Sequence, residues 1–319
     1  MSTSPAGKFG MVFPGQGSQH VGMLAELAAQ HSIVHATFAE ASNTLGYDLW
    51  QLVQAGPTEQ LSLTHITQPA ILTSSVAIWR VWQQQGGAMP ALMAGHSLGE
   101  YSALVCAGAI DFASAVSLVR QRGEFMQSAV PVGIGTMAAI LGLADAEVER
   151  CCAAATLAGN VATAANYNSP GQLVIAGHVA AVERAVVLCK EAGAKRAMVL
   201  PVSAPFHSPL MAPAAEQFSA VLAGVTLTAP RIPVIQNHSL VSSSDPDQIR
   251  LALVRQIVSP VPWVATMQLF AAQQVVKIFE IGPGKVLAGL NKRIDASLDT
   301  LAVNDPASLA QALSLPATV

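Results

Sequence analysis

The chain has 319 residues, of which 52% are hydrophobic and 11% are charged, and its formal net charge is −3. This length suits one large domain, or one domain that carries a smaller inserted one, and the apolar content supports a large core and argues against disorder. The slightly negative net charge disfavours a nucleic-acid-binding protein. Charged residues such as Arg80 and Glu100 interrupt each apolar run before it reaches the ~18 residues of a membrane span.

The N-terminal part of the chain predicts one strand followed by helices. Residues 1–8 form a short polar tail without the long apolar core of a secretory signal peptide. A strand is expected at residues 10–13, and the turn-rich residues 14–19 follow it. Helical patterns then continue to Trp82, with Pro69 in the first turn of a helix, where its missing N–H is tolerated.

Residues 91–107 predict a strand, a sharp turn and a helix. Between the strand and the helix lies Gly95-His96-Ser97-Leu98-Gly99, a Gly-x-Ser-x-Gly pattern that lifts a serine hydroxyl out of a sheet edge. The glycines are needed because side chains would collide in so tight a bend. We therefore expect Ser97 to be a nucleophile, with the N-terminus of the following helix facing any oxyanion formed beside it.

A helix is expected at residues 111–130, and one arginine lies on its apolar stripe. Phe112, Ala115, Val119, Met126 and Ala129 form that stripe. Arg122 falls on it, whereas Arg120 points away. A guanidinium on a buried face needs an anionic partner or a route to water. The partner is either a structural carboxylate, such as Glu124 or Glu100, or the carboxylate of a substrate held bidentately, and the pattern leaves both open.

The next segment predicts a small unit with its own sheet. Strands and helices are expected in the order βαββαβ at residues 136–141, 145–157, 161–166, 173–176, 179–192 and 196–202. That order is the ferredoxin-like split unit. Regular α/β alternation then resumes, with strands near residues 232–235 and 276–280.

These elements together predict an α/β fold with an interrupted main domain. We expect a hydrolase-like parallel-sheet domain from residues 1–132 and 204–319, and an inserted ferredoxin-like small domain at residues 133–203. A cleft is expected between the two.

Ser97 needs a general base, and the best candidate is His207. It lies in a turn-like segment just past a strand end, where ligands gather in open α/β sheets, and it follows the serine in the order typical of elbow enzymes. A helix-capping or surface histidine is the alternative. His96 adjoins the nucleophile, but neighbouring residues on a tight elbow point apart. No acid completes a triad, so a dyad whose imidazole is oriented by a backbone carbonyl is expected.

Two further groups complete the candidate site. The backbone N–H of Gln16, between two glycines after the first strand, can join that of Leu98 in an oxyanion hole, although a plain glycine-rich turn is the simpler interpretation. Met126 and Phe206, taken singly, are more typical of core residues.

The four cysteines bear on the compartment and on metal binding. Cys106, Cys151, Cys152 and Cys189 fall in helix-like segments without the spacing of metal ligands. We expect reduced thiols, no metal site and a cytoplasmic protein.

Several stretches, taken together, resemble a known family, the malonyl-CoA:acyl carrier protein transacylases of bacterial fatty acid synthesis. They span nearly the whole chain in the family's order and lie at residues 13–19, 95–101, 122–123, 168–172, 203–209, 256–263 and 281–287. Family members have a hydrolase-like large domain with a ferredoxin-like insertion, which agrees with the elements expected above.

The resemblance implies a role for each candidate residue. Ser97 would be the nucleophile and His207 the general base, with the backbone carbonyl of Gln256 orienting the imidazole. The Gln16 and Leu98 amides would form the oxyanion hole.

The resemblance also implies a substrate site. Arg122 would bind the malonyl carboxylate, and Met126, Asn166, Phe206 and Gln256 would contribute to the substrate site. Phe206 precedes the histidine, as in the malonyl-selective acyltransferases of polyketide and animal fatty acid synthases. Its ring would crowd an α-methyl group, so malonyl is expected over methylmalonyl.

The resemblance implies malonyl-CoA and a holo acyl carrier protein as substrates, with no cofactor, no nucleic acid, no membrane and a monomeric state. An acidic carrier would need a basic rim near the cleft. The candidates are Lys190, Lys195, Arg196, Lys285, Lys292 and Arg293.

Two other functions compete with a transacylase. A serine hydrolase or thioesterase would use the same elbow but would not need Arg122 and would favour a carboxylate as third member. A non-catalytic module that docks carrier proteins would not need Ser97, His207 and Arg122 together. A polyketide or malonate-decarboxylase transacylase is a variant of the leading class.

Overall fold

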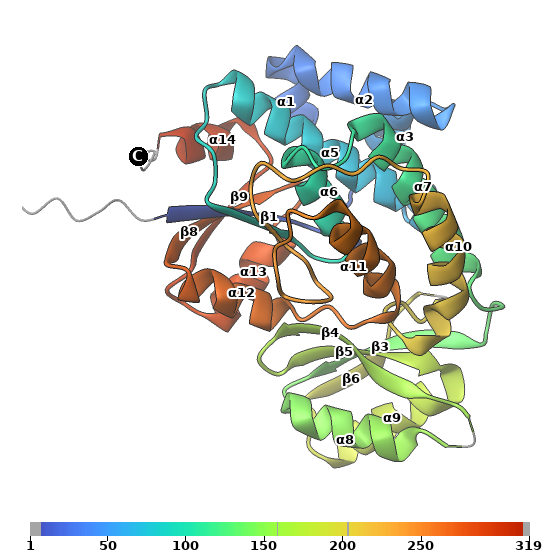
Figure 1. The fold of residues 1–319 in the computed structure, drawn as a ribbon. Helices are drawn as coiled ribbons and strands as arrows, with labels where there is room; N and C mark the ends of the chain where they lie inside the picture. Colours follow the sequence, from blue (N-terminus) through green and yellow to red (C-terminus); the bar gives the residue numbers. More distant parts are fainter. Residues whose placement is uncertain (1–7, 158, 203, 315–319) are drawn as a thin grey trace, which may run out of the picture.

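A parallel sheet of five strands lies at the centre of the larger part of the molecule in the computed structural model, which describes residues 8–157, 159–202 and 204–314 (Figure 1). Its strands, in the spatial order β7-β2-β1-β8-β9, are β7 (Val234–Ile235), β2 (Leu92–Gly95), β1 (Lys8–Phe13), β8 (Val275–Ile281) and β9 (Asp299–Val303). The last strand was not expected from the sequence. Phe13 and Gly95 are register partners, so β1 and β2 end at the same edge of the sheet, where parallel sheets place their ligand sites.

Both faces of this sheet are covered by helices. Met11 and Phe13 belong to one apolar core, and Val12 between them belongs to another on the opposite face. The first core is built with α1 (Ala25–Gln30), α2 (Ser32–Leu45), α3 (Leu49–Ala55), α4 (Thr58–Leu61), α5 (Thr64–Gln84), α6 (Gly99–Cys106), α7 (Phe112–Ser128), α10 (Ala212–Leu222), α11 (Pro246–Val258) and α14 (Pro306–Leu313). The second is built with α12 (Trp263–Ala272) and α13 (Val286–Ile294).

Helix α5 begins earlier than the sequence indicated. It starts at Thr64, so Pro69 lies inside the helix rather than in its first turn, and that prediction is wrong. The extra turn packs closely on α7, because a Cβ added to Gly123 would lie 2.7 Å from the Cα of His65. Tertiary packing here outweighs the hydrogen bond that the proline cannot donate.

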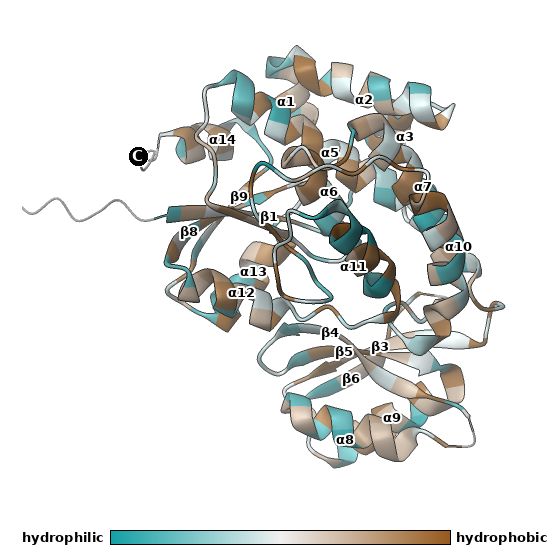
Figure 2. Ribbon diagram, in the orientation of Figure 1, coloured by the Kyte–Doolittle hydropathy of each residue, from teal (hydrophilic) through white to brown (hydrophobic). Residues whose placement is uncertain are grey.

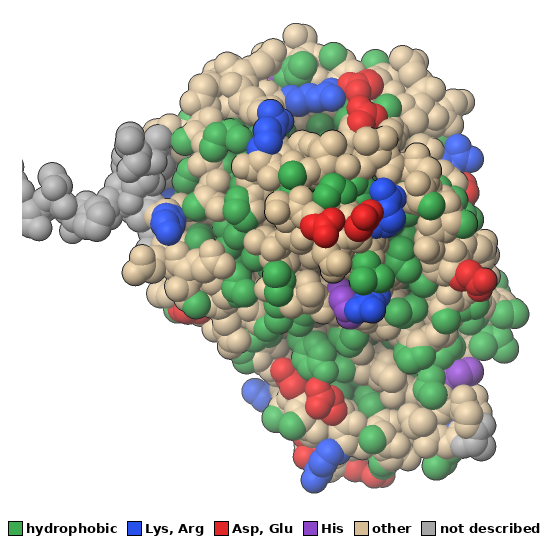
Figure 3. Space-filling view, in the orientation of Figure 1, with side chains coloured by type: hydrophobic (Ala, Val, Ile, Leu, Met, Phe, Trp, Pro, Cys, Tyr) green, Lys and Arg blue, Asp and Glu red, His purple; other side chains and the backbone are tan. Residues whose placement is uncertain are grey.

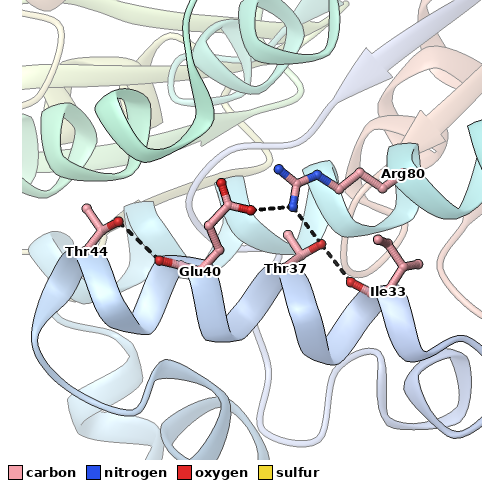
Figure 4. A network of polar contacts seen from close by, with 5 residues as sticks. All are labelled: Ile33, Thr37, Glu40, Thr44 and Arg80. Atoms are coloured by element: carbon pink, nitrogen blue, oxygen red, sulfur yellow. Dashed lines mark hydrogen bonds and ion pairs between the residues drawn. The ribbon is translucent and has the colours of Figure 1, made fainter.

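Polar contacts join α5 to α2 on the outer side of this core. Arg80 donates from Nη1 to Glu40 Oε2 at 2.7 Å and to Thr37 Oγ1 at 3.1 Å, and its guanidinium carbon lies 4.7 Å from the centre of the Phe112 ring (Figure 4). Thr37 in turn donates to the carbonyl of Ile33 at 2.8 Å. The guanidinium thus lies over an aromatic ring while its charge is paired with Glu40.

The second sheet is antiparallel and has its own core. It has the order β4-β5-β3-β6, with β3 (Gly135–Leu141), β4 (Ala162–Ser169), β5 (Gln172–His178) and β6 (Arg196–Val199), and α8 (Asp145–Ala155) and α9 (Val179–Glu191) pack on it. The predicted βαββαβ order is confirmed element by element. The exact domain limits at 132/133 and 203/204 stay a prediction.

The antiparallel sheet joins the larger part of the molecule along β4 and the segment before α12. Val261 donates its N–H to Ala165 O at 2.9 Å and accepts from Tyr167 N–H at 3.0 Å. Helix α11, which ends just before this seam, alternates hydrophilic and hydrophobic residues along its length (Figure 2). Its buried residues include Ile249, Leu253 and Gln256, so the same amphipathic face packs into the core and brings Gln256 inward.

Candidate active site

The turn after β2 holds Ser97 in a strained conformation. Its φ is +50°, a left-handed value that is uncommon for any residue except glycine. The flanking glycines allow close backbone approach, because a Cβ on Gly95 would lie 1.8 Å from the carbonyl carbon of Gly99, and one on Gly99 would lie 2.0 Å from Phe13 O. The predicted elbow is therefore confirmed as a local structure.

Asn237, which follows β7, braces this turn. Its side-chain oxygen accepts the N–H of Ser97 at 2.8 Å, and its side-chain amide donates to Gly95 O at 2.7 Å. Asn237 is fully buried, so both contacts are shielded from water. The sequence analysis missed this residue, although its position at the carboxyl end of a predicted parallel strand was a usable signal.

Ser97 and His207 form a hydrogen-bonded pair. The serine Oγ lies 2.7 Å from His207 Nε2, and His207 Nδ1 lies 3.0 Å from Gln256 O and 3.2 Å from Ser259 O. Two carbonyl acceptors place the ring proton on Nδ1, so Nε2 is left to accept from the serine hydroxyl. Backbone carbonyls thus take the place of a triad acid at this ring.

The surroundings of His207 keep its imidazole neutral. The side chain is 4% exposed, and burial, together with the nearby charge of Arg122, lowers its pKa from 6.5 to about 3. A neutral ring is the form that can accept a proton.

Arg122 projects from α7 into the same place. Its Nη1 donates to Gln68 Oε1 at 2.9 Å, and its Nη2 donates to Gln256 Oε1 at 2.8 Å and to Ser97 Oγ at 3.2 Å. The guanidinium carbon lies 5.2 Å from the centre of the Tyr101 ring. Three amide or hydroxyl oxygens therefore hold the cation beside the nucleophile.

The structural ion pair considered for Arg122 is absent from the described part of the chain. Glu124 pairs with Arg120 instead, at 3.0 Å. No carboxylate of the described residues lies within ion-pair distance of Arg122, which is 1% exposed, and its Nε has no partner there. A buried cation that is held only by neutral groups is prepared to bind an anion.

A cavity of about 260 Å³ opens above Ser97, between the two sheets. Of the residues expected at the substrate site, Arg122, Met126, Asn166 and Phe206 line it. Gln256 does not line it, since it is buried behind Arg122. The remaining walls come from α5, the turn after β2, the antiparallel sheet with the segment after β6, and α13, and they include Gln68, His96, Met137, Asn168, Gln172, Val174, Leu200, Val202, Val286, Leu287 and Leu290.

The two amides expected to form the oxyanion hole also lie at this cavity. Gln16 and Leu98 line it, and within the described residues neither backbone N–H donates to a protein acceptor. Leu98 directly precedes α6, so the positive end of that helix faces the same space.

His96 and Gln68 also line the cavity. His96 Nε2 contacts Asn168 Oδ1 at 2.9 Å, which links the elbow to the antiparallel sheet, and its ring packs on Trp263. Gln68 accepts from Arg122 and was missed by the sequence analysis. A buried glutamine among the apolar residues of α5 was the available signal.

The six basic residues considered for a rim are exposed and lie in two groups. Lys285, Lys292 and Arg293 belong to α13 and its start, and Arg293 donates to Gln172, a residue of the cavity wall, at 2.7 Å. Lys190, Lys195 and Arg196 lie at α9 and β6 of the antiparallel sheet. Only the first group is tied to the cavity by a contact in the described residues.

Neither a metal site nor a membrane-spanning helix is found in the parts of the chain that the structure describes. There is no group of three or more His, Cys, Asp or Glu side chains there that could hold a metal ion. Cys106, Cys151, Cys152 and Cys189 are free, buried thiols, as predicted. None of the described helices combines the length and apolar character that crossing a bilayer requires.

The chain matches the acyl transferase domain family over residues 11–298. It is 59% identical over 307 residues to the malonyl CoA-acyl carrier protein transacylase of Salmonella typhimurium, with 96% of this chain and 99% of the relative covered. Identity to the protein of the same name from Bacillus subtilis is 45% over 306 residues, with 96% of each chain covered.

The solved structures to which the chain is similar include malonyl-transferring enzymes as well. An acyl carrier protein S-malonyltransferase from Vibrio cholerae superposes with a TM-score of 0.94 at 59% identity, covering 95% of this chain and 99% of that one. A malonyl-transacylase in complex with its type II PKS acyl-carrier protein has a TM-score of 0.94 at 55% identity, covering 96% and 99%.

Proposed function

The chain belongs to the acyl transferase family, and from this premise we propose that it transfers a malonyl group from malonyl-CoA to the phosphopantetheine thiol of an acyl carrier protein, in support of fatty acid elongation. The observation that carries the proposal is the buried Arg122 guanidinium, 3.2 Å from the oxygen of Ser97 and without a carboxylate partner in the described residues. In malonyl, one methylene separates the free carboxylate from the thioester. A carboxylate bound to Arg122 therefore holds the thioester carbon close to Ser97.

The first half-reaction forms a malonyl ester on Ser97. His207 Nε2 takes the hydroxyl proton as Oγ attacks the thioester carbon, and the Gln16 and Leu98 amides bind the oxyanion. The oxyanion then collapses, the carbon–sulfur bond breaks, and His207 returns the proton to the departing thiolate of CoA.

The second half-reaction reverses these steps with another thiol. His207 takes the proton of the phosphopantetheine thiol as its sulfur attacks the malonyl ester, and Ser97 leaves with that proton. Two thiol substrates use one site in turn, which is ping-pong kinetics. The residues themselves supply each proton transfer, so no cofactor is proposed.

We further propose where the carrier approaches. Charged side chains lie singly or in small groups on the face seen in Figure 3, so a broad one-sign surface is not the basis of recognition there. The Lys285, Lys292 and Arg293 group of α13 is the basic region joined to the cavity wall. An acidic carrier that docks beside it could deliver its thiol to Ser97. A cytoplasmic monomer is part of the same proposal.

Intact-protein mass after brief mixing with malonyl-CoA tests the reaction. The wild type should gain one malonyl group, a Ser97→Ala variant should gain none, and holo carrier protein should clear the adduct. Release of CoA with accumulation of malonate instead of malonyl carrier would identify a hydrolase. No adduct and no turnover in the wild type would identify a docking module.

A further inference from the structure

The mechanism above gives no role to Glu100, a buried carboxyl group close to the candidate site. Glu100 lies on α6, three residues after Ser97, and is fully buried. Its Oε2 accepts from Gln256 Nε2 at 2.7 Å and from the N–H of Asn237 at 3.0 Å. It touches neither Ser97 Oγ nor the cavity among the described contacts, so its influence on the reaction must pass through these two partners.

The first partner, Gln256, has a side-chain amide with only one favourable orientation. Its Nε2 donates to Glu100 Oε2 and to Ser97 O, at 2.7 and 3.0 Å, and its Oε1 therefore faces Arg122 Nη2 at 2.8 Å. The reverse orientation would set the amide N–H groups against the guanidinium N–H groups and the amide oxygen against the carboxylate. Glu100 thus determines that the amide oxygen of Gln256, and not its nitrogen, faces Arg122.

The second partner, Asn237, connects the same carboxylate to the elbow. Glu100 Oε2 accepts the backbone N–H of Asn237, whose side chain holds the N–H of Ser97 and the carbonyl of Gly95. The elbow itself is held by the side chain of Asn237, whereas the Arg122 guanidinium contacts the Gln256 amide that Glu100 orients.

The indirect arrangement has a consequence for substrate binding. A carboxylate in direct contact with Arg122 would occupy the guanidinium edge that a substrate carboxylate needs. Glu100 instead acts through the Gln256 amide, so the cavity side of the guanidinium stays open.

We propose that Glu100 is a positioning residue for recognition of the malonyl carboxylate: through the amide of Gln256 it holds the Arg122 guanidinium toward the cavity without competing for it. This role rests on the proposed function. It concerns selectivity between acyl groups more than the rate of acyl transfer itself, because an acetyl group has no carboxylate for Arg122 to bind.

Two substitutions at Glu100 test the role. Glu100→Asp keeps a carboxyl group but withdraws the acceptor oxygen from Gln256, and Glu100→Gln keeps an acceptor oxygen at the same reach. In Glu100→Asp, kcat/KM for malonyl-CoA should fall about 10- to 100-fold, mainly through KM, while acetyl transfer changes less than about threefold. Glu100→Gln should retain most of the malonyl preference. Acetyl transfer by the same preparation is the internal control for misfolding.

A double-mutant cycle with Gln256→Leu tests whether Glu100 acts on Arg122 through the amide of Gln256. This variant retains the backbone carbonyl that orients His207 but removes the amide. Once Gln256 is leucine, Glu100→Asp should lower the malonyl-to-acetyl ratio no further. Equal losses of malonyl and acetyl transfer in Glu100→Asp, or full additivity in the cycle, would overturn the role. A wild type that forms no malonyl adduct would instead overturn the proposed function.

Discussion

At the scale of single residues, the site combines an uncharged base with a buried cation. His207 is neutral because burial and Arg122 lower its pKa to about 3. The Arg122 guanidinium itself is hydrogen-bonded to the uncharged side chains of Gln68 and Gln256. The cation disfavours a protonated imidazole next to it, so the base stays ready to accept the serine proton. The same cation binds the acyl carboxylate in the proposed reaction.

Replacing Arg122 by alanine should therefore separate the two acyl groups. Loss of charge-assisted hydrogen bonds of roughly 1.5–3 kcal/mol each predicts a fall in malonyl transfer of at least about tenfold. Acetyl transfer should be unchanged or higher. Steady-state kinetics with both CoA esters measures the ratio, and an equal loss for both would mean that Arg122 has only a structural role.

The raised pKa of Glu100 predicts how the free energy of unfolding depends on pH. Burial raises its pKa from 4.5 to about 7, so between these values the native state keeps a proton that the unfolded state has released. The native state therefore loses stability relative to Glu100→Gln as pH rises through this window, by on the order of 3 kcal/mol. Urea unfolding of both proteins at about pH 5 and about pH 8 measures the difference.

His207 titrates in both proteins of that comparison, so its contribution cancels. A stability difference that does not vary with pH would contradict the assignment of the raised pKa to Glu100.

At the scale of elements, the nucleophile depends on how closely α6 approaches the end of β1. Gly99 opens the helix and lies against Phe13 O, and Asn237 joins the elbow to the segment after β7. The positive φ of Ser97 is maintained by these contacts on both sides.

Gly99→Ala should consequently destabilise the protein. The added Cβ would lie 2.0 Å from a backbone oxygen, so main chain must move, at a cost of about 1–3 kcal/mol or more. Gly289→Ala on α13 is the matched control, since nothing lies within 4 Å of its Cβ, and it should be neutral or stabilising. Thermal unfolding of the two variants compares them. Similar midpoints would show that the close approach is not needed.

At the scale of the whole molecule, the cavity is formed where the antiparallel sheet meets the turns and helices of the larger part of the molecule. Phe206 packs against both the main core and the small cluster around Met137 and Val174 on the antiparallel sheet. It also lines the cavity beside His207. Its ring is thus held from two sides at the wall of the cavity that also contains Ser97.

Phe206→Ala should relax selectivity against methylmalonyl. A methyl group in an apolar pocket is worth about 1–3 kcal/mol, so the relative kcat/KM for methylmalonyl-CoA should rise about 10-fold or more. Competition between the two CoA esters for one carrier protein measures the ratio directly. Malonyl transfer by the variant is the control, and an unchanged ratio would exclude steric selection by this ring.

The sequence by itself determined those features that depend on local order. Glycine spacing around Ser97, the apolar stripe that carries Arg122 and the βαββαβ order each depend on residues close together in the chain, and each agrees with the structure. Strand β9 and the true start of α5 were not found, because both are stabilised by packing against distant elements.

Only the tertiary structure decided what surrounds these residues. Gln68 and Asn237 come from α5 and from the end of β7, and no periodicity relates them to Arg122 or Ser97. That Glu100 reaches Arg122 only through the amide of Gln256 is likewise a result of the folded structure. Which carboxylate pairs with which arginine also depended on distances in space, since Arg120 pairs with Glu124 and Arg122 has no carboxylate partner among the described residues. A nucleophile can be recognised from a short motif, whereas the groups that position it converge only when the chain has folded.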